Sequence, residues 1–283
     1  MKNATAYAFK NGIRQWRIAL IVYVIQLLLA MTLGMQIYQV LEASIGNSLE
    51  LGKLLTEYNH TVFSDLLNVH GASISPLIGQ ARWVLLAYLV FSAFINGGLL
   101  YSVTIGSNQW KDFWYGGSEF FLKFLKLTFI YLIIYLVWIA FIGISSAYVF
   151  GQMLEFSSER IAIRAWTLIA ILAIIGMVLI FIASAYSKFD IINEQKIWTS
   201  FKKGWNTLLS QFGSITVTTL SLGLIFIVIW CIYLSLEAIL GMSSPVLIVI
   251  FFLLQQLVVY SRIVWKLMIY NGLYRIIHFK KLS

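Results

Sequence analysis

Six apolar segments, each long enough to cross a bilayer as a helix, constrain the fold of this chain most strongly. They cover about 17–41, 82–106, 120–149, 161–187, 213–239 and 245–271. A bilayer leaves open backbone groups without water, and these segments are too long and too evenly apolar for barrel strands. Only 11% of the residues are charged, against about a quarter in soluble domains. The sequence therefore predicts an all-α polytopic membrane protein with six transmembrane helices.

Nothing in the sequence marks a boundary between separate domains. The chain of 283 residues has 2 prolines and no run rich in Ser, Gly or Pro. We therefore expect one membrane domain over 1–283. Its single cysteine, Cys231, has no intrachain disulfide partner, which also excludes a cysteine-based metal site.

The first, third and fifth apolar segments share a lead-in that begins Phe-x-x-Gly and continues with aromatic and basic residues. The three lead-ins are FKNGIRQW from Phe9, FWYGGSEFF from Phe113 and FKKGWNTLL from Phe201. Rings and cations together suit short helices at the membrane–water interface. Because the pattern recurs before alternate spans, it indicates internal repetition. We predict three units, each an interfacial helix followed by a hairpin of two spans, at about 1–108, 109–196 and 197–283.

The second, fourth and sixth segments end on motifs that contain small residues. These motifs are FINGGLLYS, FIASAYSKF and MIYNGLYRI. Small residues let helix backbones approach each other closely, so we interpret the motifs as packed helix crossings. A binding role for Asn96 and Asn271, which lie in the first and third motifs, is the alternative.

The basic residues favour one side of the membrane. If the N-terminus is inside, 16 of the 20 Lys and Arg residues fall on the inner side, and Lys53, Arg82, Arg160 and Arg164 fall outside. Cytoplasmic loops carry this excess of Lys and Arg in membrane proteins. We therefore predict that both termini are cytoplasmic, and we attribute the net charge of +9 to topology rather than to nucleic-acid binding.

The loop between the first two spans is longer than its counterparts and reads as an amphipathic helix over about 47–71. Apolar residues recur at a spacing of three to four residues on one face. We expect this helix to end at Gly71 and to lie on the outer membrane surface or over the outer ends of the bundle. The residues of its apolar face are Leu51, Leu54, Leu55, Tyr58, Val62, Leu66 and Val69.

The same segment holds a single Glu-x-x-His motif, formed by Glu57 and His60. Dimetal sites need two such motifs and further glutamates, whereas the nearest additional ligands here are Asp65 and His70. We interpret the motif as a solvated polar face and predict no metal and no cofactor. The sequence also lacks Gly-x-Ser-x-Gly, His-Glu-x-x-His and Gly-Lys-Ser/Thr motifs, so we predict no catalytic residues. A membrane enzyme that acts on lipid through Glu57, His60 and Asp65 is the third alternative for function.

The last span combines polar and basic residues within an apolar segment. Glutamines at mid-depth suit hydrogen bonds to neighbouring helices, and long cationic side chains reach toward the interface. The alternative is a cavity for an anionic lipid headgroup, walled by Arg262 and Lys266 with help from Lys188 or Arg275. With Asn96, the candidate ligand-binding or lipid-binding residues in this span are Gln255, Gln256, Arg262, Lys266 and Asn271.

The lead-ins AFKNGIRQW, DFWYGGSEFF and SFKKGWNTL, together with the six-helix plan, carry a resemblance to a known group of proteins. The chain resembles uncharacterised prokaryotic six-span proteins related to the membrane domain of some glycerophosphodiester phosphodiesterases. Because this sequence shows no soluble phosphodiesterase domain, the resemblance does not carry that activity over. It implies a bacterial inner-membrane protein without a catalytic centre of its own.

These patterns lead to one favoured function and one alternative. We expect a non-enzymatic integral inner-membrane protein that serves as a membrane-embedded partner or scaffold subunit of an envelope export, insertion or lipid-handling assembly. The alternative is a transporter or lipid-binding protein whose cavity lies between the repeats and is lined by the last span. The expected partners are anionic lipid headgroups on the cytoplasmic face and other membrane proteins, with no nucleic acid.

Overall fold

The described part of the chain is all-helical. The computed structural model describes residues 2–45, 60–152, 159–193, 196–241 and 244–282, which form nine helices and no strands. The helices are α1 (Lys2–Arg14), α2 (Trp16–Ile45), α4 (His60–Ile105), α5 (Trp110–Glu119), α6 (Phe121–Gln152), α7 (Glu159–Ile192), α8 (Ile197–Ser210), α9 (Phe212–Leu240) and α10 (Pro245–Leu282).

Six of these helices are long and apolar enough to cross a membrane, which confirms the predicted number of spans. They are α2, α4, α6, α7, α9 and α10. Their apolar stretches are Trp16–Val40, Gly79–Ile105, Phe121–Gly151, Arg160–Ile192, Phe212–Leu240 and Val246–Ile277. The chain therefore has the composition and architecture of an integral membrane protein.

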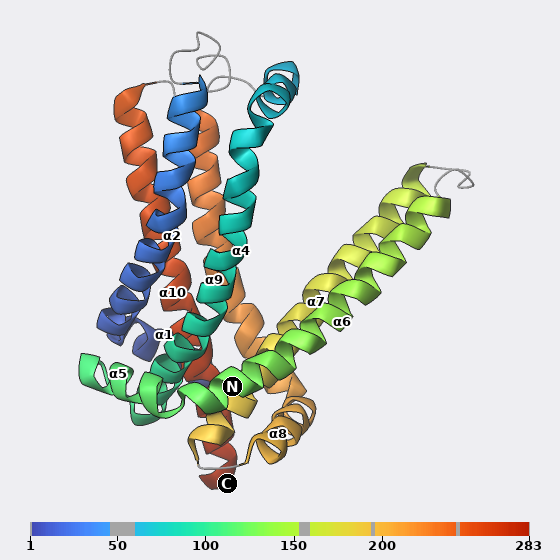
Figure 1. The fold of residues 1–283 in the computed structure, drawn as a ribbon. Coiled ribbons are helices and arrows are strands. Elements are labelled where there is room, and N and C mark those ends of the chain that lie inside the picture. Colours follow the sequence, from blue (N-terminus) through green and yellow to red (C-terminus); the bar gives the residue numbers. More distant parts are fainter. Residues whose placement is uncertain (1, 46–59, 153–158, 194–195, 242–243, 283) are drawn as a thin grey trace.

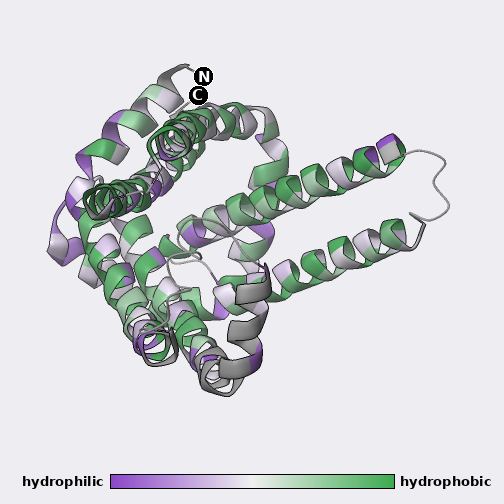
Figure 2. Cartoon of the chain, turned by 90° about the horizontal axis from the view of Figure 1, so that it is seen from above, coloured by the Kyte–Doolittle hydropathy of each residue, from purple (hydrophilic) through white to green (hydrophobic). Residues whose placement is uncertain are grey.

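Four long helices form a bundle, and the other two leave it as a separate hairpin. In Figure 1, α2, α4, α9 and α10 run side by side, whereas α6 and α7 diverge from them together. The view from above in Figure 2 shows the same hairpin extending away from the bundle. Hydrogen bonds fix α10 between two neighbours: Tyr260 OH donates to the Trp16 carbonyl of α2 at 3.0 Å, and Trp265 Nε1 to the Leu222 carbonyl of α9 at 2.8 Å.

One predicted helix boundary is wrong. We expected a helix to end at Gly71, but α4 begins at His60 and continues through Gly71 to Ile105. A glycine ends a helix where the chain takes a left-handed turn, and Gly71 is in an α-helical stretch instead. Residues 47–59 of the predicted amphipathic helix lie outside the described residues.

The three lead-ins form the short helices α1, α5 and α8, as the sequence predicts. Each short helix packs across the last turns of a long one: α5 on α4, α8 on α7, and α1 on α10. The glycine of each Phe-x-x-Gly motif faces the long helix at a distance that leaves no room for a side chain. A Cβ atom added there would lie 2.4 Å from Met268 Cγ at Gly12, 2.4 Å from Tyr101 Cβ at Gly116 and 2.1 Å from Ser187 Oγ at Gly204.

Small residues on the long helices complete these crossings. A Cβ on Gly97 of α4 would lie 2.8 Å from the Gly116 carbonyl oxygen, and one on Gly272 of α10 would lie 3.3 Å from Ala8 Cβ. The predicted close packing of the small-residue motifs is therefore confirmed. The partners in these crossings are the short helices, a pairing that the sequence analysis left open.

The hairpin of α6 and α7 has its own internal packing. The Trp138 indole lies over Gly176, where an added Cβ would be 2.1 Å from Trp138 Cε2. Trp138 Nε1 also donates to the Ala173 carbonyl at 3.3 Å, and Tyr131 shares a 2.8 Å hydrogen bond with Ser187. The outward faces of both helices are apolar and exposed, with residues such as Ile133, Val137, Ile144, Ile163, Leu168 and Ile174.

We predict that Gly204→Ala destabilises the protein by about 1–3 kcal/mol, because the new Cβ meets backbone atoms of α7 that do not move easily. Gly223→Ala is the matched control, since a Cβ there has nothing within 4 Å. The control is expected to be neutral or to stabilise α9 by about 0.5–1 kcal/mol. The measurement is the temperature at which detergent-solubilised protein loses its monodisperse peak. Equal transition temperatures for both variants would contradict the close crossing.

Candidate functional site

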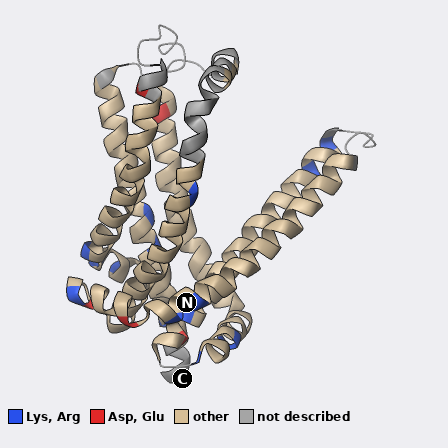
Figure 3. Cartoon of the chain, in the orientation of Figure 1, with Lys and Arg blue, Asp and Glu red and all other residues tan. Residues whose placement is uncertain are grey.

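Buried polar side chains gather where the short helices cross the bundle. They lie in the last turns of α4, α7 and α10, at the start of α2, and on α8 and α9. Figure 3 shows most of the drawn charges at the same end, near the two termini. A buried polar group costs free energy unless it is hydrogen-bonded, so the partners of each group decide its role. The buried polar residues are Gln15, Asn96, Ser102, Ser184, Ser187, Lys188, Asp190, Ser200, Thr218 and Asn271.

Asn96 joins α4 to α10. Its Oδ1 accepts from Lys266 Nζ at 3.0 Å and from Tyr270 OH at 3.1 Å. The Lys266 ammonium also lies 5.6 Å from the centre of the Tyr270 ring, a cation–π distance. Two of the residues singled out from the sequence, Asn96 and Lys266, are therefore direct partners.

Asn271 belongs to a different network, around the junction of α1 and α2. Its Nδ2 donates to Gln15 Oε1 at 2.9 Å, and Gln15 Nε2 donates to the carbonyls of Ser102 and Ser107, both at 3.2 Å. The Asn271 Nδ2 also reaches the Leu267 carbonyl at 2.9 Å. These bonds tie α1, α10 and the end of α4 together.

A cavity of about 550 Å³ lies between α2, α4 and α10. Gln256 and Arg262, two of the candidate residues, line it. The Gln256 Oε1 accepts from Tyr23 OH at 2.9 Å. Gln255 is not a lining residue, because its Nε2 donates to Tyr233 OH on α9 at 2.9 Å. The full lining is Tyr23, Gln26, Leu27, Leu29, Ala30, Leu33, Ala81, Val84, Leu85, Tyr88, Gln256, Val259 and Arg262.

Three cations of α7 and α10 are the basic candidates for this region. Arg262 lines the cavity, Lys266 follows one turn later on α10, and Lys188 of α7 is buried with 7% of its surface exposed. Arg262 and Lys266 are four residues apart on α10, so their side chains share one face of the helix. Among the residues that the structure describes, no carboxylate pairs with any of the three.

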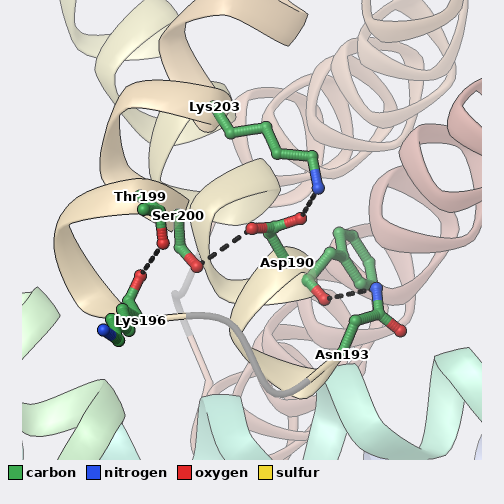
Figure 4. Close-up of polar contacts among 7 residues, drawn as sticks. Asp190, Asn193, Lys196, Thr199, Ser200 and Lys203 are labelled. Atoms are coloured by element: carbon green, nitrogen blue, oxygen red, sulfur yellow. Dashed lines mark hydrogen bonds and ion pairs between the residues drawn. The ribbon is translucent and has the colours of Figure 1, made fainter.

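The nearest acid in the sequence, Asp190, has other partners. Figure 4 shows its carboxylate between Ser200 and Lys203 of α8; Ser200 Oγ donates to it at 3.0 Å, and Lys203 forms an ion pair with it. Residues two positions apart on a helix are rotated by about 200° around its axis, so their side chains point to nearly opposite sides. Asp190 accordingly faces away from Lys188. Asp190 therefore holds α8 on α7 and does not neutralise Lys188. The sequence analysis did not anticipate this contact.

The sequence analysis also missed two tyrosines of the cavity, Tyr23 and Tyr88. Tyr23 and Gln26 stand three residues apart in the first span, so they share a helix face. That spacing indicates a polar face on the first span, from which Tyr23 could have been predicted. Tyr88 carried no such signal, because its approach to the cavity depends on how α4 packs against α2 and α10.

The described part of the Glu-x-x-His segment shows no metal-binding arrangement. His60 is exposed and its Nε2 lies 3.5 Å from Ser64 Oγ, while Glu57 lies outside the described residues. Over the part of the chain that the structure describes, no three His, Cys, Asp or Glu side chains group as metal ligands would.

We predict that Asn96→Ala lowers stability by about 1–3 kcal/mol, because Lys266 and Tyr270 lose the acceptor that they share. Asn206→Ala, on the exposed face of α8, is the matched control and is expected to stay within about 0.5 kcal/mol of the wild type. Thermal unfolding in detergent, followed by tryptophan fluorescence, measures both. If the two variants unfold at the same temperature, Asn96 does not join α4 to α10.

Comparison with known protein families, with curated proteins and with solved structures finds no match to this chain. The resemblance drawn from the three lead-ins therefore stays a prediction.

Proposed function

We propose that this protein is a non-enzymatic integral membrane protein that acts as the membrane-embedded partner or scaffold subunit of a larger envelope assembly, in export, insertion or lipid handling. The observation that carries this proposal is the hairpin of α6 and α7. A hairpin that departs from its own bundle offers two apolar helices to the transmembrane helices of another protein.

The exposure of the hairpin supports this role. Ile144 of α6 is 72% exposed and Leu168 of α7 is 66% exposed, and green hydrophobic colour runs along both helices in Figure 2. Within a bilayer the hydrophobic effect does not drive helices together, so association depends on packing and shape. The hairpin packs against itself through Trp138 and Gly176 and leaves its outward faces free for such packing.

The proposal includes an orientation, a repeat and a location. In it, both termini face the cytoplasm of a bacterial cell, the protein resides in the inner membrane, and three units each consist of a short helix and two spans. The basic residues support the orientation, because 16 of 20 fall on one side. The glycine crossings of α1, α5 and α8 support the repeat, since each uses the same position of the same motif.

A second candidate function is favoured by the cavity between α2, α4 and α10. In this candidate the protein is a transporter or lipid-binding protein, and α10 supplies the polar contacts through Gln256 and Arg262. A volume of about 550 Å³ lies within the range of small-molecule sites in proteins.

We predict that a photoreactive benzoylphenylalanine at Ile144 or Leu168 crosslinks in living host cells to one discrete protein. Matched controls at Leu220 of α9 and Leu253 of α10, which are 62% and 58% exposed, are expected to give lipid adducts and no discrete protein band. The adducts are separated by mass and identified by mass spectrometry. The same adduct pattern at all four positions would exclude the hairpin as the partner-binding element.

We also predict the labelling pattern of two single-cysteine variants made in a Cys231→Ser background. A membrane-impermeant maleimide added to intact spheroplasts is expected to label Ser244→Cys, before α10, and to label Lys196→Cys, before α8, only after the membrane is opened. The two loops join opposite ends of the spans, so the pair tests orientation directly. Labelling in the reverse order would contradict cytoplasmic termini.

A further inference from the structure

We propose that the cavity between α2, α4 and α10 binds the phosphate-bearing headgroup of an anionic lipid, with Arg262, Lys266 and Lys188 as its counter-charges. This inference rests on the second function proposed above and names the chemistry of that site. Its starting point is a charge imbalance inside the membrane-spanning part of the chain.

The imbalance arises because Arg262 lines the cavity, Lys266 follows it by one helical turn and Lys188 is buried on α7, while none of them has an acidic partner among the described residues. A charge within a bilayer is costly unless it pairs with an opposite charge or reaches water, and like charges in proximity add to that cost. The Asp190 carboxylate is occupied by Ser200 and Lys203. An anion from outside the chain would balance these charges where they do not reach water.

The cations retain donors for such an anion. Lys266 has three N–H donors and gives one to Asn96 Oδ1, and Arg262 makes no hydrogen bond to a described residue. The same holds for Lys188, which is 7% exposed and has no hydrogen bond to the described chain. A guanidinium and ammonium groups side by side are the usual recognition elements for a phosphate group.

The remaining lining fits the rest of a lipid molecule. Tyr23 OH donates to Gln256 Oε1, so the free group of that amide is its donor Nε2. The lining also includes Gln26 and Tyr88, and the rest of it is aliphatic, with residues such as Leu27, Leu33 and Leu85. A ligand that matches both parts has an anionic head and an apolar chain, which selects a membrane phospholipid over inorganic phosphate.

The test measures headgroup preference on the full chain purified in detergent. Phosphatidylglycerol, phosphatidylcholine or inorganic phosphate is titrated in, and native mass spectrometry counts the bound molecules. The wild type is expected to bind one phosphatidylglycerol in preference to phosphatidylcholine. Arg262→Gln is expected to lower the affinity for phosphatidylglycerol about tenfold or more, and Arg262→Lys is expected to retain part of that affinity. Arg164→Gln, which removes an exposed cation from α7, is the matched control and should bind as the wild type does.

A second variant tests the site without changing its charge. Leu85 lines the cavity but is 67% exposed, so Leu85→Trp is expected to fold and to block part of the space. This variant should lower the affinity for phosphatidylglycerol by at least several-fold. This variant keeps the proposal testable if Arg262→Gln does not fold.

The possible results distinguish a failure of the anionic-lipid site from a failure of the proposed lipid-binding function. Equal binding of both lipids, still weakened by Leu85→Trp, would overturn the anionic preference and leave a lipid-binding site. Displacement of the lipid by millimolar inorganic phosphate would overturn the lipid as the source of the anion. No bound lipid of either class would overturn both the inference and the lipid-binding function.

Discussion

Close contact between three short helices and the ends of three long ones is the constraint on which the rest of this structure depends. At Gly12, Gly116 and Gly204 the helices approach so closely that a Cβ would meet an atom of the partner within 2.4 Å. Lipid tails solvate apolar side chains as well as other helices do, so such packing must supply much of the attraction. All three crossings lie at one end of the molecule, and the hairpin of α6 and α7 diverges from the bundle at the other.

The crossings also determine where polar groups are buried. The short helices cover the ends of α4, α7 and α10. Several polar groups beneath them find partners across the crossings, as Gln15 does with Asn271 and Asp190 with Ser200. Arg262 and Lys266 precede the turns of α10 on which α1 packs through Met268 and Gly272. Lys266 donates a hydrogen bond to Asn96 of α4, whereas Arg262 lines the cavity.

The sequence was sufficient for features that depend on local pattern. Six spans, three short helices and the small-residue crossings follow from apolar length, from the Phe-x-x-Gly lead-ins and from motifs such as FINGGLLYS. Features that depend on the order of helices could not be derived. The bond between Gln15 and Asn271 joins residues 256 positions apart, and the cavity combines three helices whose adjacency no local pattern encodes. The predicted helix end at Gly71 was wrong because a glycine is compatible with both the end and the interior of a helix.

The measurement that most directly tests this account is the distance between spin labels in lipid nanodiscs, read by pulsed electron resonance. One pair joins Met35 of α2 to Tyr148 of α6, and the other joins Met35 to Val246 of α10. All three positions are exposed and lie away from the short-helix crossings. If the helices are joined mainly at the crossings and the hairpin diverges, the distance from Met35 to Tyr148 is clearly the longer. Two similar, short distances would show that α6 and α7 pack along the bundle and would contradict the account.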